Sequence, residues 1–300
     1  MTKVLCLGNC SYDITMPLEE FPLENIKYRV KEKVECGGGP ASNAAYLLGK
    51  WGIDTYFAGI VGNDLYGNKI KEEFNKVGVK TNYLELAKNV ETPVSYILVN
   101  KKNASRTIFT YRNQNIKMHK KRYGINPDYI LVDGEEKEMA EFVLRRNKKA
   151  IKIIDAGKYN DDVVRLAKLC DYIVASKNFA EDFTGIKINL DNGNSINEIF
   201  RILESNFHGN MVITVEKDGC LYKNDGVVKL MPGYAVKALD TTGAGDIFHG
   251  AFVYALVKGY SYEDIMRFAN ITGGLSVRKI GGRYSVPELR EVFDVYEKSL

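Results

Sequence analysis

Short apolar runs along the chain alternate with longer stretches in which apolar residues recur every three or four positions. The first run, Lys3–Leu7, predicts a strand. Further runs predict buried strands at Thr55–Val61, Tyr129–Asp133, Ile151–Asp155, Tyr172–Ala175 and Met211–Val215. A short pair, Gly219–Lys223 and Val227–Met231, follows the last of them. Each of these runs is short enough to be one strand of a covered sheet.

The three- and four-residue spacing between the strands predicts amphipathic helices. We expect them at Ala41–Trp51, Tyr66–Val77, Glu136–Arg146, Asp161–Leu169, Asn178–Thr184, Ile196–Phe207, Gly243–Lys258, Tyr262–Val277 and Val286–Lys298. Strands that alternate with helices build a mostly parallel sheet with helices on both faces. The pattern therefore predicts an α/β fold with such a sheet at its centre.

Two regions, at about residues 14–36 and 92–115, do not follow this alternation of strands and helices. Tyr28–Val34 has a period of two, and Val94–Asn100 and Arg106–Tyr111 flank a short turn, as in a hairpin. Neither region has a helix to cover it. We expect them to join into a small β-sheet that serves as a lid, within a single domain that spans residues 1–300.

Composition and charge exclude several classes of function. The net charge is only +4, so the basic clusters Lys117–Arg122 and Arg145–Lys149 are interpreted as solvated faces rather than a nucleic-acid interface. The five cysteines have no second Cys/His pair at ligand spacing, which favours free thiols in a reducing compartment. No signal-peptide pattern and no long apolar run occurs. We expect a cytoplasmic protein without a membrane or nucleic-acid partner.

The segment Asp240–Asp246, with the sequence DTTGAGD, carries the clearest chemistry. It opens a predicted helix, and its small residues leave the first-turn N–H groups approachable by an anion such as phosphate. Asp246 lies just beyond this platform, where it could accept a proton from an attacking hydroxyl. For a lone aspartate, stabilisation of the helix N-terminus would be the simpler interpretation.

Two other nucleotide-binding motifs do not fit. No G-x-x-x-x-G-K-[ST] segment occurs, so the chain is not a P-loop enzyme. The third glycine of a dinucleotide fingerprint is replaced by Phe248, and the segment lies far from the first strand. A dehydrogenase is therefore disfavoured.

Over essentially its whole length, the sequence resembles the ribokinase-type (PfkB) family of carbohydrate and nucleoside kinases. Asp240–Gly250 matches the C-terminal signature of that family, and Gly38–Asn43 matches the N-terminal one. Asp13 follows the first strand, and Val61–Gly67 resembles the linking stretch. Two separated signatures in the right order are more specific than either alone.

The resemblance implies roles for single residues. Asp246 would be the catalytic base and Gly243, Ala244 and Gly245 the anion hole. The residues implied on the substrate side are Asp13, Asn43, Arg106 and Asp133, with Gly38 and Gly39 as a lid hinge that lets the backbone approach the sugar. Arg106 could equally be a solvated hairpin residue, and Asp133 could instead cap the helix that follows it.

The resemblance also implies where ATP and its metals would bind. The residues implied on the nucleotide side are Asn178, Thr214, Glu216, Gly219 and Asn270. Asn178 and Glu181 would organise Mg²⁺ through water, although Asn178 could also be a helix N-cap. A monovalent cation such as K⁺ would be held by Asp240, Thr242, Val277, Ile280, Gly282 and Ser285.

The predicted function is transfer of the γ-phosphoryl group of MgATP to a hydroxyl of a ketose or related small sugar. Pro40 replaces a lysine of several ribose-type members, which argues against ribose itself. A nucleoside kinase is the first alternative, with an aromatic slot built from Tyr12, Tyr28, Phe109 or Tyr111. A non-catalytic sugar or nucleotide sensor is the second. Because edge strands readily pair, we also expect a homodimer through the lid.

Overall fold

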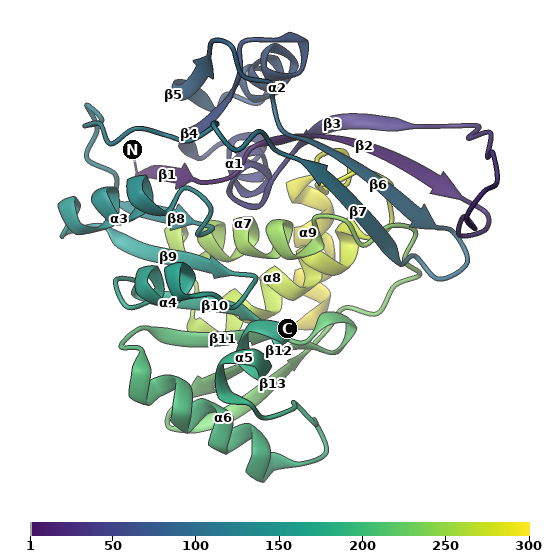
Figure 1. The fold of residues 1–300 in the computed structure, drawn as a ribbon. Coiled ribbons are helices and arrows are strands. Elements are labelled where there is room, and N and C mark those ends of the chain that lie inside the picture. The colour runs from purple at the N-terminus through teal and green to yellow at the C-terminus, as the bar shows by residue number, and fades with distance from the viewer. Residues whose placement is uncertain (1) are drawn as a thin grey trace.

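A nine-stranded sheet forms the centre of the protein in the computed structural model, which describes residues 2–300 (Figure 1). Its strand order is β13-β12-β11-β10-β9-β8-β1-β4-β5. The strands are β1 (Lys3–Leu7), β4 (Asp54–Gly62), β5 (Lys80–Ala87), β8 (Tyr129–Val132), β9 (Ile151–Ala156), β10 (Tyr172–Ser176), β11 (Asn210–Thr214), β12 (Gly219–Asn224) and β13 (Val227–Pro232). From β11 to β5 every neighbouring pair is parallel, whereas β12 and β13 are antiparallel additions. The predicted mostly parallel sheet is confirmed.

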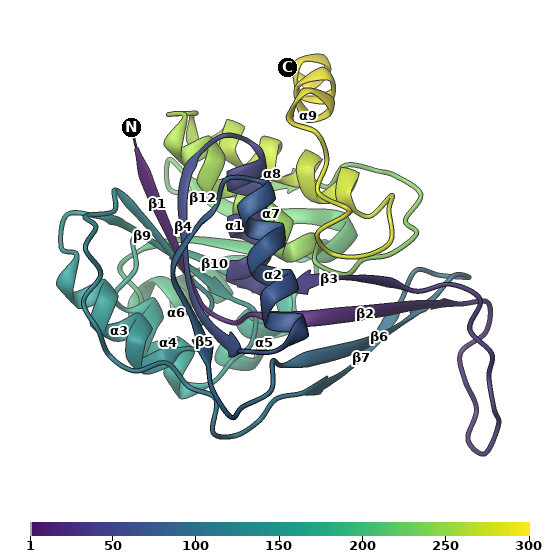
Figure 2. The same ribbon diagram turned by 90° about the horizontal axis from the view of Figure 1, so that it is seen from above.

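Helices cover both faces of this sheet (Figure 2). One hydrophobic core holds α1 (Pro40–Lys50), α2 (Leu65–Lys76), α7 (Ala244–Val257), α8 (Tyr262–Ser276) and α9 (Leu289–Tyr296). The other holds α3 (Lys137–Arg146), α4 (Asp161–Ala167), α5 (Lys177–Thr184) and α6 (Gly193–Asn206). In α7 every residue from Ile247 to Ala255 is buried, because the helix lies between the sheet and its neighbours α1 and α8.

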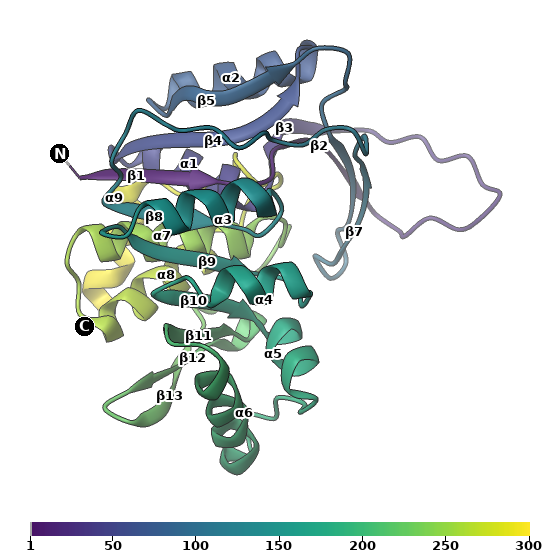
Figure 3. The ribbon, with the colours of Figure 1, turned by 60° about the vertical axis from the view of Figure 1, so that its left-hand side comes forward.

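A separate four-stranded sheet has the order β3-β2-β6-β7 and projects from one end of the main sheet (Figures 1 and 3). Its strands are β2 (Ser11–Leu18), β3 (Val34–Gly38), β6 (Val94–Asn100) and β7 (Arg106–Tyr111). β2 and β6 are parallel, and the other two pairs are antiparallel. The predicted hairpin of β6 and β7 is confirmed with both strand boundaries as expected.

Two local predictions are wrong, and one strand of the main sheet was missed. Tyr28–Val34 is not a strand: the chain between β2 and β3 is irregular, and only Val34 belongs to β3. Its alternating pattern has no neighbouring strand with which to pair. β5 was not predicted, because this edge strand is only partly buried and mixes polar with apolar residues. The last helix begins at Leu289 rather than Val286.

Within residues 2–300 the chain has no helix with the length and apolar character that crossing a membrane requires.

Candidate active site

Two backbone N–H groups at the N-terminus of α7 are available to bind a ligand. Gly243 is the N-cap residue, with a φ of 76°, a left-handed conformation that glycine adopts without strain. The N–H groups of Gly245 and Asp246 have no acceptor within residues 2–300, whereas Ala244 donates to the carbonyl of Thr241 at 3.3 Å. A Cβ at Gly245 would meet no atom within 4 Å, so this turn faces open space. Two N–H groups at a helix N-terminus favour an anion here.

Asn43 orients the carboxylate of Asp246. Asn43 lies in the second turn of α1, and its Nδ2 donates to Asp246 Oδ2 at 2.7 Å. The packing of α1 on α7 brings the two residues together across 203 positions of sequence. Asn43 Oδ1 is buried and has no partner within residues 2–300. Asn43 Oδ1 is therefore free to accept a hydrogen bond. Asp246 Oδ1 likewise accepts none from residues 2–300.

Asp13 is a buried carboxylate close to Asp246. It lies on β2, 5% exposed, and accepts a hydrogen bond from Ser11 Oγ at 3.0 Å. Burial, and to a smaller extent the negative charge of Asp246, raises the pKa of Asp13 to about 6. Gly38 is required beside it, since a Cβ there would lie 2.1 Å from Asp13 Oδ2. Asp13 can thus exchange a proton near neutral pH.

Asp133 joins three segments of the chain. Its Oδ2 accepts from the N–H groups of Asn9 (2.8 Å) and Ala41 (3.1 Å), and its Oδ1 accepts from Glu135 (3.1 Å). Ala41 lies in the first turn of α1, so Asp133 caps that helix. It does not cap α3, the helix that follows it, whose N-cap residue is Glu136. Burial raises the pKa of Asp133 to about 7.

His249 lies one turn beyond Asp246, and sequence reasoning missed it. Its Nδ1 is 2.6 Å from the carbonyl oxygen of Gly245 and 3.3 Å from Asp155 Oδ2, and its Nε2 is 3.2 Å from the carbonyl oxygen of Val174. Both ring nitrogens thus face acceptors. Burial raises the pKa of Asp155 to about 6, although the neighbouring imidazole opposes this effect. The sequence did contain a signal for it, because His249 interrupts an otherwise apolar stretch of the predicted helix.

The small sheet presents two different faces. Asp13, Ser95 and Thr110 share the inner face, where Ser95 Oγ and Thr110 Oγ1 are 3.2 Å apart. The alternate residues Tyr96 and Phe109 pair across the strands on the outer face and are 45% and 59% exposed.

The tip of the small sheet contacts the loop before α7. Arg106 Nη1 donates to Thr241 Oγ1 at 2.6 Å, and Thr241 Oγ1 donates to the carbonyl oxygen of Ala104 at 3.2 Å. Arg106 is exposed and at the same time hydrogen-bonded to the loop before α7.

Asp240 ties together the two loops in which the resemblance placed a monovalent cation. Its Oδ1 accepts from the Thr242 N–H at 2.8 Å and its Oδ2 from the Gly281 N–H at 2.9 Å. The carbonyl of Val277 already accepts from Leu239 and that of Gly282 from Ser285 Oγ. Ile280 lies in the second loop, between the residues already engaged. Thr242 Oγ1 is buried and without a partner in residues 2–300.

Residues implied for the nucleotide lie around the end of β11. Thr214 ends this strand and donates to the carbonyl of Ala175 at 3.3 Å, and Glu216 and Gly219 border the following 3-10 turn. Gly219 has a φ of 108°, and a Cβ there would lie 2.1 Å from the carbonyl oxygen of Met231. Asn270 Nδ2 donates to the same oxygen at 3.0 Å, which holds α8 against β13.

The segment implied for Mg²⁺ is the first half of α5. Ser176, not Asn178, is its N-cap residue, since Ser176 Oγ accepts from the Phe179 N–H at 3.0 Å. The Glu181 carboxylate is buried and accepts from Lys187 Nζ at 2.7 Å and from the Ile188 N–H at 3.0 Å. No group of three His, Cys, Asp or Glu side chains that could hold a metal occurs in residues 2–300. This donor set fits an ion held by phosphates and water rather than by a protein cage.

A buried arginine was also missed. Arg283 is 1% exposed, and its Nη1 lies 2.7 Å from Glu73 Oε2, while its Nη2 donates to Ser42 Oγ at 2.5 Å. Glu73 also accepts from the Gly37 N–H at 2.9 Å. The ion pair therefore links the loop after α8 to α2, α1 and β3.

Comparison with known proteins identifies the family. A profile of the pfkB family of carbohydrate kinases matches residues 1–289. The chain belongs to this family. It is therefore a kinase that transfers a phosphoryl group to a sugar hydroxyl, as the two signatures predicted.

Relatives with assigned activities match over nearly the whole chain. A ribokinase of Staphylococcus aureus is 28% identical, covering 98% of this chain and 99% of the relative. A nucleoside kinase of Methanocaldococcus jannaschii is 22% identical, covering 99% of this chain and 98% of the relative.

Solved structures share the fold. A putative ribokinase from Agrobacterium tumefaciens is 25% identical with a TM-score of 0.89, covering 99% of this chain and 98% of the other. The Arabidopsis thaliana ribokinase complexed with ribose and ATP is 21% identical with a TM-score of 0.81, and it covers 99% of this chain and 98% of its own. The predicted α/β architecture with an accessory sheet is thus confirmed.

Proposed function

We propose that this kinase transfers the γ-phosphoryl group of ATP to a hydroxyl of a small free sugar, a pentose or a ketose. The single observation that carries the proposal is the position of Asp246. Its carboxylate is oriented by Asn43 and lies one residue after the uncommitted N–H of Gly245. A base and an anion-binding turn side by side are what an in-line attack by an alcohol requires.

In the proposed mechanism each group has one role. Asp246 accepts the proton of the attacking hydroxyl as its oxygen bonds to the γ-phosphorus, while the bond from that phosphorus to the β,γ-bridging oxygen breaks and ADP leaves. The N–H groups of Gly245 and Asp246 donate to the phosphoryl oxygens, on which charge accumulates in the transition state. Asp13 and Asn43 offer polar atoms to the other hydroxyls of the sugar, and Ser95 and Thr110 border them on the inner face of the small sheet.

Two cations fit this site. Asn178 and Glu181 would hold the water shell of Mg²⁺, which would neutralise charge on the phosphates. K⁺ would lie between the two loops joined by Asp240, where the unpartnered Thr242 hydroxyl is available. Its charge there would favour phosphate at the neighbouring N-terminus of α7.

The test replaces the proposed base by its isostere. In Asp246→Asn the amide cannot take the proton, so kcat should fall by roughly 10²–10⁴-fold. ATP affinity, measured by calorimetry, should stay within about threefold, because the amides of α7 remain. A rate close to that of the wild type would remove Asp246 from the base role. Loss of ATP binding together with activity would indicate a structural role instead.

A panel of acceptors tests the substrate class. Release of ADP is measured with ribose, fructose and other free sugars and, separately, with nucleosides. We expect turnover with a free sugar, in line with the ribokinase of Staphylococcus aureus among the relatives. Turnover with nucleosides alone would overturn the sugar proposal.

The nucleoside alternative draws on the Methanocaldococcus jannaschii relative. It needs an aromatic slot for the base next to Asp13. Of the aromatic residues available, Tyr12 stacks on Tyr66 with ring centroids 4.5 Å apart, while Phe109 and Tyr111 share the outer face of the small sheet. This arrangement favours a free sugar over a nucleoside.

The outer face of the small sheet also supports the homodimer. Tyr96, Phe109 and Tyr111 are exposed there, and such aromatic patches are typical of protein–protein contacts. Sedimentation of the wild type against Phe109→Lys measures the association directly, and a monomeric wild type at micromolar concentration would refute it.

A further inference from the structure

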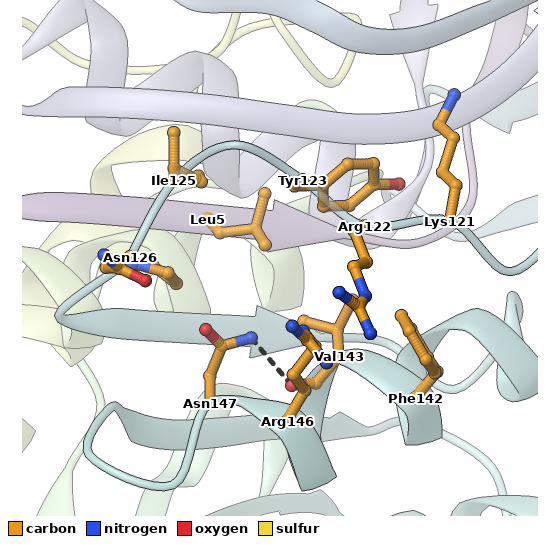
Figure 4. Close-up of a pocket in the computed structure, with 11 residues that line it drawn as sticks. Leu5, Lys121, Arg122, Tyr123, Ile125, Asn126, Phe142, Val143, Arg146 and Asn147 are labelled. Atoms are coloured by element: carbon orange, nitrogen blue, oxygen red, sulfur yellow. Dashed lines mark hydrogen bonds between the residues drawn. The ribbon is translucent and has the colours of Figure 1, made fainter.

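A cavity of about 380 Å³ lies beside α3, away from the residues described above. The partly buried apolar side chains Ile125 and Phe142 line it, together with the exposed side chains of Arg122 and Arg146 (Figure 4). Residues 126 and 127 come just before β8, and residue 147 follows the last turn of α3. The cavity is thus near the amino ends of β8 and β9, whereas Asp133 and Asp155 stand at their carboxyl ends.

The two basic clusters of the sequence converge on this cavity. Lys121 and Arg122 come from the first cluster and Arg146 from the second. The fold therefore brings together positive charges that are more than twenty residues apart in sequence. All three side chains are exposed, as expected for solvated faces, but they lie together at one cavity.

Only some of these charges are neutralised by the protein. Lys121 pairs with Glu85 at 2.7 Å, and Arg145, which does not line the cavity, pairs with Glu141 at 2.8 Å. Arg122 and Arg146 form no ion pair within residues 2–300. Figure 4 shows both guanidinium groups turned toward the space between the segment of residues 121–127 and the end of α3.

Two unpaired guanidinium groups at one cavity repel each other, and an anion between them would remove that repulsion. Arg146, in the last turn of α3, also complements the negative end of the helix. That role does not extend to Arg122, which comes from an irregular segment. The planar fork of arginine matches a phosphate in two-point contact.

We propose that this cavity binds the phosphomonoester dianion of a small metabolite at a site separate from the active site. Arg122 and Arg146 contact the phosphate, and Ile125 and Phe142 border the organic part. The segment that carries Arg122 runs from β7 of the small sheet to β8. A bound ligand would therefore join the chain that leaves the small sheet to the end of α3.

The test uses methyl groups as local reporters, because any phosphate compound can also bind at α7. Methyl-labelled protein is titrated with inorganic phosphate, ribose 5-phosphate and AMP in separate experiments. The methyl signals of Ile125 and Val143 report on the cavity, and those of Ile247 report on the first turn of α7. The variants are Arg122→Gln and Arg146→Gln. Arg145→Gln is the matched control, since it removes one neighbouring charge from outside the cavity.

We expect at least one probe to shift the Ile125 and Val143 signals in the wild type and in Arg145→Gln, with equal dissociation constants. In Arg122→Gln and Arg146→Gln the dissociation constant should rise by about tenfold, which is about 1.4 kcal/mol. A stronger response to the organic phosphates than to inorganic phosphate identifies a metabolite, and the reverse identifies free phosphate. Shifts of Ile247 alone, no shift at all, or equal affinities in all three variants would overturn the proposal.

Discussion

Replacement of Arg283 by methionine should destabilise the protein severely, although methionine nearly fills the space that the arginine side chain occupies. The guanidinium is buried and bound to Glu73 and Ser42, and its centre lies 4.4 Å above the ring of Phe74. Removing one partner of a buried ion pair lowers stability by about 3–5 kcal/mol, because the other charge stays buried without compensation. The Glu73 side chain is 17% exposed and keeps its bond from Gly37, so we expect a loss of about 3 kcal/mol.

The measurement is urea denaturation followed by circular dichroism, with Arg278→Met as the matched control. Arg278 pairs with Glu291 at 2.8 Å, but both side chains are at least one-third exposed, so its loss should cost less than about 1 kcal/mol. In the double variant Arg283→Met/Glu73→Leu, part of the lost stability should return, since neither charge of this pair remains. Equal losses in Arg283→Met and Arg278→Met would refute the assignment of a stabilising role to the buried pair.

Two other predictions concern buried groups around the active site. Burial raises the pKa of Asp133 from 3.8 to about 7, so the folded protein holds this proton more tightly, and the stability that it contributes is lost as pH rises from about 4 to about 7. The fall in unfolding free energy over this range should be shallower in Asp133→Asn, and identical slopes would contradict the prediction. His249→Asn should lower kcat by roughly tenfold without unfolding the protein, because His249 holds the carbonyl of the Gly245–Asp246 peptide, whose N–H faces the proposed phosphate position. A full rate in a folded His249→Asn variant would exclude this positioning role.

Much of the main sheet could be predicted because its strands are buried on both faces. β1, β8, β9, β10 and β11 are short apolar runs between amphipathic helices, and a local pattern identifies them. β5 has only one buried residue, Leu84, in eight, so its pattern resembles that of a loop. The opposite error occurred at Tyr28–Val34, where a period of two is present but no strand lies alongside. Period alone does not reveal whether a partner exists.

In the candidate active site, too, some features could be predicted from local sequence and others could not. The helix start at Gly243 and the carboxylate of Asp246 belong to one continuous segment, so local chemistry identifies them. The partner of Arg283 lies 210 residues away, and nothing in the sequence around Glu73 indicates an ion pair. Asp133 is a second example. Its position in the sequence suggested that it caps the helix that follows it, whereas in the fold it caps α1. Contacts between distant segments depend on the packing of layers, which periodicity does not describe.

The packing of α1 against α7 has a consequence for how the chain folds during synthesis. Trp51, just after α1, donates from its Nε1 to the carbonyl of Pro287 at 3.1 Å, a contact that spans 236 residues. At about 5–20 residues per second, the ribosome needs roughly 10–50 s to make the intervening chain. α7 ends at Val257, so for most of that interval the apolar face of α1 has no α7 to cover it. The nascent chain therefore exposes the apolar residues of α1 that pack on α7 until α7 has been synthesised.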